Sequence, residues 1–410
     1  MIKNIIKQLW NRRKANGWIV TELVLVSVFL WILIFKLLNT YDQFTRPMGF
    51  DIEDTYRLVL DCSKEGATDY VVPQNAETGT IDDLLTVFER VRLVPGVEAL
   101  ASMSCAMPYS PCNSAAMFTA KTGKDTLTCS GLHRIVTPDY FKVFRILTPE
   151  GRIAGQDIKP IMMVLSKDLA DSLRVQRGDS VLNGISNSSH PRIVDLCTKV
   201  RYAEAWEDRP NGYLVLNEQG MIRNWGIYPD QICLRLKGDL SEAQRQQVWK
   251  EVEKACRVNN FSFFYTTPFK DIRKDYNTRI TDYVKMNLWY AVFLLVNILL
   301  GIIGTFWFST QHRRGEIGLR MALGATRKNV FGHLVLEGLI LQGAAMCVTI
   351  LLCLNLYVFN TIFVADRFLP EYLLSGLLTW ILVALMIVLG IWYPANEAAG
   401  TNPVDALRYE

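Results

Sequence analysis

The sequence predicts an α+β membrane protein in which four transmembrane helices carry one large extracytoplasmic α/β domain on a helical stalk. Three observations lead to this fold class. Four apolar runs are each long enough to cross a bilayer as a helix. Lysines and arginines gather at the ends of these runs. The stretch between the first and second runs, roughly 245 residues, is long enough to fold as a domain.

The four predicted transmembrane helices cover residues 17–38, 286–309, 330–359 and 373–393. The second and fourth runs contain no charged residue, and buried helices of soluble proteins rarely stay uncharged for so long. The first run is too long for the core of a signal peptide and no Ala-x-Ala site follows it, so we expect a retained anchor. Glu22 and Glu337 lie inside spans near their cytoplasmic ends, and the sequence leaves open whether they serve function or structure.

The distribution of basic residues predicts the orientation. Five lysines and arginines precede the first run, five lie between the second and third, and Arg367 alone lies between the third and fourth. Because basic loops stay in the cytoplasm, we expect a cytoplasmic N-terminal segment (1–16), a cytoplasmic loop (310–329) and a cytoplasmic tail (394–410). Residues 39–285 then form the outside domain, and 360–372 form a short outside loop.

The outside domain shows a strand–helix–strand pattern twice, at 55–104 and at 231–267. Thr80 and Ser241 are the expected N-caps of the two helices. Two such units at the ends of the domain predict one split βαβ subdomain interrupted by an insertion at about 105–230. The insertion is expected to be rich in strands, at 134–141, 161–166, 180–185, 192–200 and 213–217.

A stalk helix is predicted at the end of this domain. Apolar residues recur at spacings of three and four from Phe269 to Tyr283, and neither glycine nor proline separates them from the second apolar run. We therefore expect one continuous helix over 269–308, of which about 269–285 is the stalk. At 1.5 Å per residue its length is on the order of 60 Å, twice the bilayer core.

The cysteines and the missing motifs limit the chemistry. Seven of the nine cysteines fall in the outside domain, and one disulfide is most plausible among Cys105, Cys112 and Cys129. The alternative is that all seven are small buried apolar side chains. The sequence contains no P-loop, no HExxH and no GxSxG motif, so we expect no catalytic residue, no metal site and no directly bound cofactor. A net charge of +4 gives no reason to expect nucleic acid as a partner.

The loop at 310–329 is basic, half apolar and punctuated by glycine. A helix over about 314–323 places Ile317, Met321 and Ala325 on one side, and Gly324 falls where a left-handed residue ends a helix. Two interpretations stay open from composition. One is an amphipathic helix lying among lipid headgroups, and the other is a docking helix that fits a groove of a soluble partner.

Three stretches resemble a known family. "RRGEIGLRMALGATRKNVF" resembles the cytoplasmic loop of MacB-type ABC transporter permeases, the superfamily that includes LolC/LolE and FtsX proteins. "VTPDYFKVFRILTPEGR" and "YPANEAAGTNPVDALRYE" resemble that family's periplasmic and closing motifs. The first span departs from the family's commoner "LGIxIG" pattern.

The resemblance implies a permease subunit of the bacterial inner membrane that is not an enzyme by itself. A separate P-loop ATPase binds ATP and Mg, and the permease pairs with a second copy or a sister permease. The outside domain is then periplasmic and porter-like, and its movement couples ATP hydrolysis to export or extraction of a periplasmic or membrane substrate. The alternative is an FtsX-like signalling subunit that regulates a periplasmic cell-wall enzyme. Membrane lipid and a periplasmic adaptor or enzyme are further expected partners. The ATPase-coupling residues implied by the loop motif are Arg314, Glu316, Ile317, Gly318, Arg320, Met321, Gly324, Ala325 and Arg327.

Overall fold

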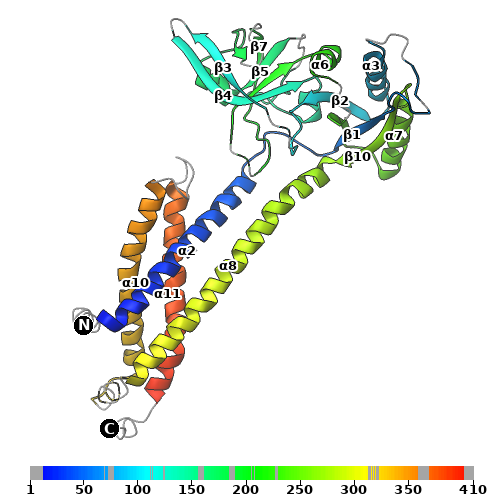
Figure 1. Cartoon of the computed structure of the whole chain (residues 1–410). Helices are drawn as coiled ribbons and strands as arrows, with labels where there is room; N and C mark the ends of the chain where they lie inside the picture. The colour runs from blue at the N-terminus through cyan, green and yellow to red at the C-terminus, as the bar shows by residue number, and fades with distance from the viewer. Residues whose placement is uncertain are drawn as a thin grey trace. The chain divides into compact units, whose positions relative to one another are not determined.

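The computed structural model covers the whole chain (Figure 1). The described residues are 13–68, 70–72, 78–110, 112, 114–122, 125–155, 161–183, 190–204, 206, 208–226, 230–312, 315, 317, 319, 323–358 and 369–400. The chain forms two compact units. One unit comprises Met1–Thr45 and Ile280–Glu410, and the other comprises Arg46–Arg279.

The first and last strands of the Arg46–Arg279 unit form the predicted split βαβ subdomain. In the sheet its four strands stand in the order β10-β1-β9-β2, with antiparallel neighbours throughout. One helix follows β1 and another follows β9, so each βαβ half contributes one connection. The elements are β1 (Thr55–Cys62), α3 (Gly79–Arg92), β2 (Val97–Ser104), β9 (Ile232–Leu236), α7 (Glu242–Ala255) and β10 (Phe261–Pro268).

Both helices pack an apolar stripe on this part of the sheet. Buried leucine, valine and phenylalanine side chains of α3 share a core with Val248 and Val252 of α7 and with the strands. The helix at Ser241 starts as predicted, because Ser241 and Gln244 form a reciprocal capping box. The prediction for Thr80 is wrong. Helix α3 already begins at Gly79, with Thr78 as a cap residue whose side chain makes no capping hydrogen bond.

The insertion continues the same sheet in the order β2-β4-β8-β5-β7, and the whole sheet has ten strands among the described residues. Two neighbouring pairs, β4 with β8 and β5 with β7, run parallel. The strands are β3 (Ala115–Thr122), β4 (Asp125–Val136), β5 (Met162–Ser166), β6 (Leu182–Asn183), β7 (Arg192–Cys197) and β8 (Asn211–Val215). Three short helices accompany them, α4 (Tyr140–Val143), α5 (Lys167–Leu173) and α6 (Glu218–Trp225).

The insertion differs from the expectation in two places. The β3–β4 hairpin was not predicted as a pair, although it is paired along its whole length. The strand expected at 134–141 ends at Val136, and the chain turns into α4. At the turn the Thr137 hydroxyl accepts a hydrogen bond from the Ser102 amide (3.1 Å), which joins the end of β4 to β2. The two aromatic residues of this stretch, Tyr140 and Phe141, consequently enter the core from a helix.

The other unit contains the four predicted membrane helices: α2 (Arg13–Thr45), α8 (Phe269–His312), α10 (Arg327–Val358) and α11 (Leu369–Gly400). All four are long and apolar enough to cross a membrane. Helix α8 starts at the predicted residue and is uninterrupted over 44 residues, about 66 Å at 1.5 Å per residue. The continuous helix predicted from Phe269 is therefore confirmed, and its first turns belong to the sheet-containing unit.

A tryptophan joins α2 to α11 within this bundle. The Trp31 indole donates a hydrogen bond to the Tyr372 carbonyl at 3.1 Å, and the two ring centroids are 5.1 Å apart. Gly376 lies one turn further along α11. A Cβ atom there would come within 2.5 Å of the Trp31 ring, so glycine is what permits this close approach.

We expect Gly376→Leu to weaken the helix bundle by about 2 kcal/mol or more, because the added side chain has to displace a buried indole ring. Thermal unfolding of the purified protein in mild detergent measures the effect. Gly343→Leu on α10 is the matched control, because no atom lies within 4 Å of the Cβ position there. Equal melting temperatures for the two variants would show that Trp31 repacks without cost.

Candidate functional site

The loop between α8 and α10 contains the residues that the sequence marks for coupling. Only part of it belongs to the described structure. Residues Ile317, Gly324 and Ala325 are placed, and Arg327 is the first residue of α10. The other five predicted residues lie outside the described residues: Arg314, Glu316, Gly318, Arg320 and Met321.

Two of the placed residues face the helix bundle. Ile317 is 7% exposed and belongs to the apolar core that also contains Leu23 of α2 and Leu334 of α10. Ala325 packs against the same core. Burial of these side chains holds the loop on the bundle at two points, one before and one after Gly324.

The end of the loop helix has the predicted conformation. Gly324 has a φ of +96°, in the left-handed region that favours glycine. The Leu323 amide still donates to the Leu319 carbonyl at 3.0 Å. Directly afterwards the Thr326 hydroxyl accepts a hydrogen bond from the Asn329 amide (3.3 Å), as an N-cap does at the start of α10. The change of direction between the two helices is therefore built from Gly324 and Thr326.

Two leucines that the sequence analysis did not single out point away from the bundle. Leu319 is 52% exposed and Leu323 is 81% exposed. They are four residues apart in one helical turn, so their side chains are neighbours. The helical spacing could have identified them, because residues two and six positions after Ile317 lie on the opposite side of a helix from it. The outward face of the loop thus contains an apolar pair.

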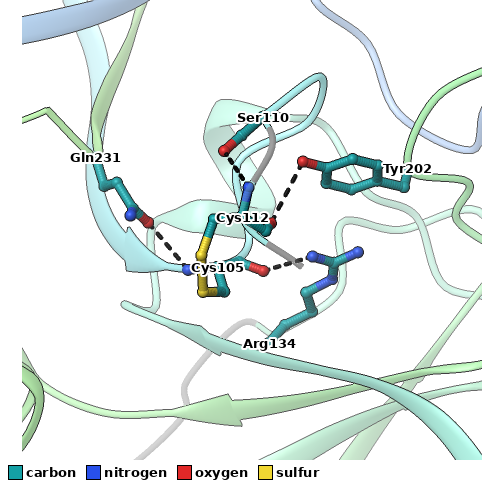
Figure 2. The surroundings of a disulfide bond; sticks show 6 residues. All are labelled: Cys105, Ser110, Cys112, Arg134, Tyr202 and Gln231. Carbon is teal, nitrogen blue, oxygen red and sulfur yellow. Dashed lines mark hydrogen bonds between the residues drawn. A yellow bond between two sulfur atoms is a disulfide. The ribbon is translucent and has the colours of Figure 1, made fainter. Parts of the chain in front are cut away.

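A second region of interest surrounds a disulfide in the outside domain (Figure 2). Cys105 and Cys112 are bonded, which confirms one bridge among the three predicted cysteines, and Cys129 is free. The Gln231 side chain accepts a hydrogen bond from the Cys105 amide (3.0 Å), and the Tyr202 hydroxyl donates to the Cys112 carbonyl (3.4 Å). Arg134 donates to the Cys105 carbonyl, and its guanidinium lies 4.8 Å from the Tyr202 ring centroid.

Within the described residues, no group of three or more histidine, cysteine, aspartate or glutamate side chains is arranged to hold a metal ion. Burial and the charge of Arg134 lower the pKa of His133 to about 4, so this imidazole is a neutral core residue at physiological pH.

Comparison with known families addresses the helix bundle directly. Residues 289–403 match the family model described as FtsX-like permease C-terminal. This range contains α8 from Trp289 onward, the loop, α10 and all of α11. The chain thus contains an FtsX-like permease domain and is similar to the MacB/FtsX family of ABC transporter permeases.

Known relatives of this permease include the macrolide export ATP-binding/permease protein MacB of Escherichia coli O157:H7, which is 25% identical over 293 residues. MacB of Escherichia coli K12 is 24% identical over 298 residues. Each alignment covers 67% of the permease and 43% of the relative, so the chain spans less than half the length of these relatives.

Solved structures also align with the permease. The periplasmic region of MacB from Actinobacillus actinomycetemcomitans aligns with a TM-score of 0.34 and 12% identity, covering 58% of the permease and 98% of that chain. A domain of a permease protein from Porphyromonas gingivalis aligns with a TM-score of 0.32 and 15% identity, covering 54% of the permease and 92% of that domain's chain.

Proposed function

We propose that this chain is the membrane subunit of a MacB-like ABC system and that its 310–329 loop docks on a separate P-loop ATPase, which binds ATP and Mg. One observation carries the proposal. Leu319 and Leu323 are exposed on a loop that Ile317 fixes to the bundle core. An apolar pair on a short helix is the usual means of filling a hydrophobic groove in a partner. Permeases of this family work with ATPases.

Helix α8, which precedes the loop, supports a mechanical role for the permease. Helix α8 runs without interruption from Phe269 to His312, the residue at which the loop begins. A continuous helix moves largely as one body, so displacement at its loop end reaches its other end. We propose that this movement rearranges the periplasmic domain and drives export or extraction of a periplasmic or membrane substrate.

The proposed orientation follows from the basic residues at the ends of the spans. The N-terminal segment, the loop and the tail lie in the cytoplasm of a bacterial cell, and the sheet-containing domain lies in the periplasm. The permease pairs with a second copy or a sister permease, and a periplasmic adaptor is a further partner. The second candidate function is FtsX-like signalling, in which the same movement controls a periplasmic cell-wall enzyme. The match of residues 289–403 to an FtsX-like permease model agrees with both functions and does not separate them.

The test is purification of the tagged permease from its native membrane in mild detergent, followed by identification and weighing of the chains that accompany it. We expect a P-loop ATPase at one copy per permease. Leu319→Asp combined with Leu323→Asp should abolish the association, since losing two interface leucines costs about 3 kcal/mol, roughly a hundredfold in Kd. Leu93→Asp is the control, because Leu93 is 82% exposed on the other unit.

Each outcome decides between the candidates. An ATPase that stays bound to the double variant shows that other residues make the contact. A wild-type permease that purifies alone, or with a periplasmic enzyme only, overturns the transporter proposal and favours the signalling function.

A further inference from the structure

The chain passes between the two units twice, after Thr45 and after Arg279. The residues just after the first passage and those just before the second both contact one short stretch between β7 and β8, which we call the junction segment (Lys199–Asp208). The residues considered below all belong to the sheet-containing unit. Their contacts show how the chain entering from α2 and the chain leaving into α8 are held there.

The chain that follows α2 is held by backbone and charge. The Arg201 amide donates to the Met48 carbonyl at 2.9 Å. Arg46 forms an ion pair with Asp208 (3.5 Å), which also pairs with Lys199 (2.7 Å) and Arg201 (3.0 Å). Burial acts to raise the pKa of Asp208, but these three cations outweigh it and hold the pKa below its ordinary value. Asp208 therefore stays ionised throughout the physiological range.

The first turns of α8 are held by a buried carboxylate. The Glu204 side chain is fully buried and accepts hydrogen bonds from two residues of α8. Arg273 Nε lies 2.6 Å from Glu204 Oε1, and Asn277 Nδ2 lies 3.0 Å from Glu204 Oε2. Close by, the Trp206 indole donates to the Tyr276 hydroxyl.

The disulfide loop is the third element that meets Glu204. Tyr109 lies between the bonded cysteines, and its hydroxyl donates to Glu204 Oε1 at 3.4 Å. Burial and the charge of Glu204 raise the pKa of Tyr109, so the phenol keeps its proton and remains a donor. The Tyr109 ring also lies against that of Tyr276 on α8, with centroids 5.8 Å apart.

We propose that Glu204 is a positioning residue that makes the start of α8, the disulfide loop and the chain after α2 move together. The connection to the last of these runs through Arg201, whose guanidinium donates to the Glu204 carbonyl at 2.6 Å. The inference rests on the proposed function for the cause of the movement, but the linkage itself exists without it. Replacing Glu204 by glutamine keeps the shape and turns one acceptor into a donor that faces Arg273, Asn277 or Tyr109.

The first experiment measures deuterium uptake by backbone amides of the purified permease without any ATPase. In Glu204→Gln we expect exchange to rise about tenfold or more in three segments together, 46–50, 105–112 and 270–279, since the buried carboxylate that accepts hydrogen bonds from Arg273, Asn277 and Tyr109 is lost. In the double variant Cys105→Ser and Cys112→Ser, exchange should rise at 105–112 and remain at the wild-type level at 46–50. Asp54→Asn, which breaks the 2.6 Å Arg245–Asp54 pair elsewhere in the unit, is the control and should affect none of the three segments. A rise confined to 201–208, or a uniform rise over the unit, overturns the proposal.

The second experiment adds the co-purified ATPase and ATP. In the wild type, ATP should change the exchange of all three segments. In Glu204→Gln the response should persist at 270–279 and vanish at 105–112 and 46–50, while the rate of ATP hydrolysis is retained. If ATP changes nothing in the wild type, the proposed function fails and the ATP-free experiment still decides the linkage. If all three segments respond equally in Glu204→Gln, Glu204 is a structural residue and the linkage proposal is wrong.

Discussion

Gly49→Ala is expected to destabilise the sheet-containing unit by about 3–5 kcal/mol, a loss typical of strain at a special backbone conformation combined with overpacking. Gly49 has a φ of +78°, and a Cβ atom there would lie 2.1 Å from the Lys199 carbonyl oxygen. The strain of the left-handed conformation contributes about 1 kcal/mol. The clash contributes the rest, because a backbone carbonyl has no other rotamer to adopt.

Thermal unfolding followed by intrinsic fluorescence measures this effect, and a loss of this size lowers Tm by roughly 6–20 °C. Gly151→Ala is the matched control. Gly151 also has a positive φ, +87°, but no atom lies within 4 Å of its Cβ position, so the variant carries the strain alone. If both variants lose the same stability, the contact between Gly49 and Lys199 is looser than the structure shows.

The free energy of unfolding of the same unit should fall by about 3 kcal/mol between pH 6.5 and pH 4 because of His133. His133 is 2% exposed on β4. Burial, with a smaller effect from Arg134, lowers its pKa from 6.5 to about 4. Between these two pH values His133 is protonated in the unfolded chain and neutral in the folded chain. The contribution of His133 to the free energy of unfolding is therefore complete above pH 6.5 and is lost progressively as the pH falls to 4.

Denaturant unfolding at pH 7.5 and pH 4.5 tests this expectation in the wild type and in His133→Phe, which cannot titrate. Carboxylates affect both proteins alike, so the difference between the two pH dependences isolates His133. The variant should lose clearly less stability on acidification. Equal losses would mean that the imidazole is protonated in the fold.

The elements that the sequence predicted well are those set by local periodicity. The four membrane helices, the continuous helix from Phe269 and the cap at Ser241 depend on residues within a few turns of one another. The β3–β4 hairpin was missed because β3 is rich in alanine and threonine and the first half of β4 is mostly polar, so apolar and polar residues alternate weakly in both. Thr80 was misjudged by a shift of two residues, the usual uncertainty of a helix start.

Among the functional residues, too, the sequence predicted what depends on local sequence and missed what depends on packing between distant segments. Motif resemblance located the loop at 310–329, but the direction of each side chain depends on the bundle core that buries Ile317 and leaves Leu319 exposed. No sequence signal marks Glu204. Its partners Tyr109 and Arg273 lie 95 and 69 positions away, so the cluster exists only once the insertion and the start of α8 have packed together.

The pairing of β1 has a consequence for synthesis of the chain. Strand β1 hydrogen-bonds to β9 and β10 and to no other described strand. From Cys62 to its partner Phe261 the ribosome must add 199 residues (261 − 62), which at about 5–20 residues per second takes roughly 10–40 s. During this time α2 has already been made. Strand β1 has no partner on either edge until β9 is complete at Leu236, and its second edge stays open until β10 is made. A nascent chain interrupted anywhere before Pro268 therefore presents an open β edge, the form in which strands of different chains join and aggregate.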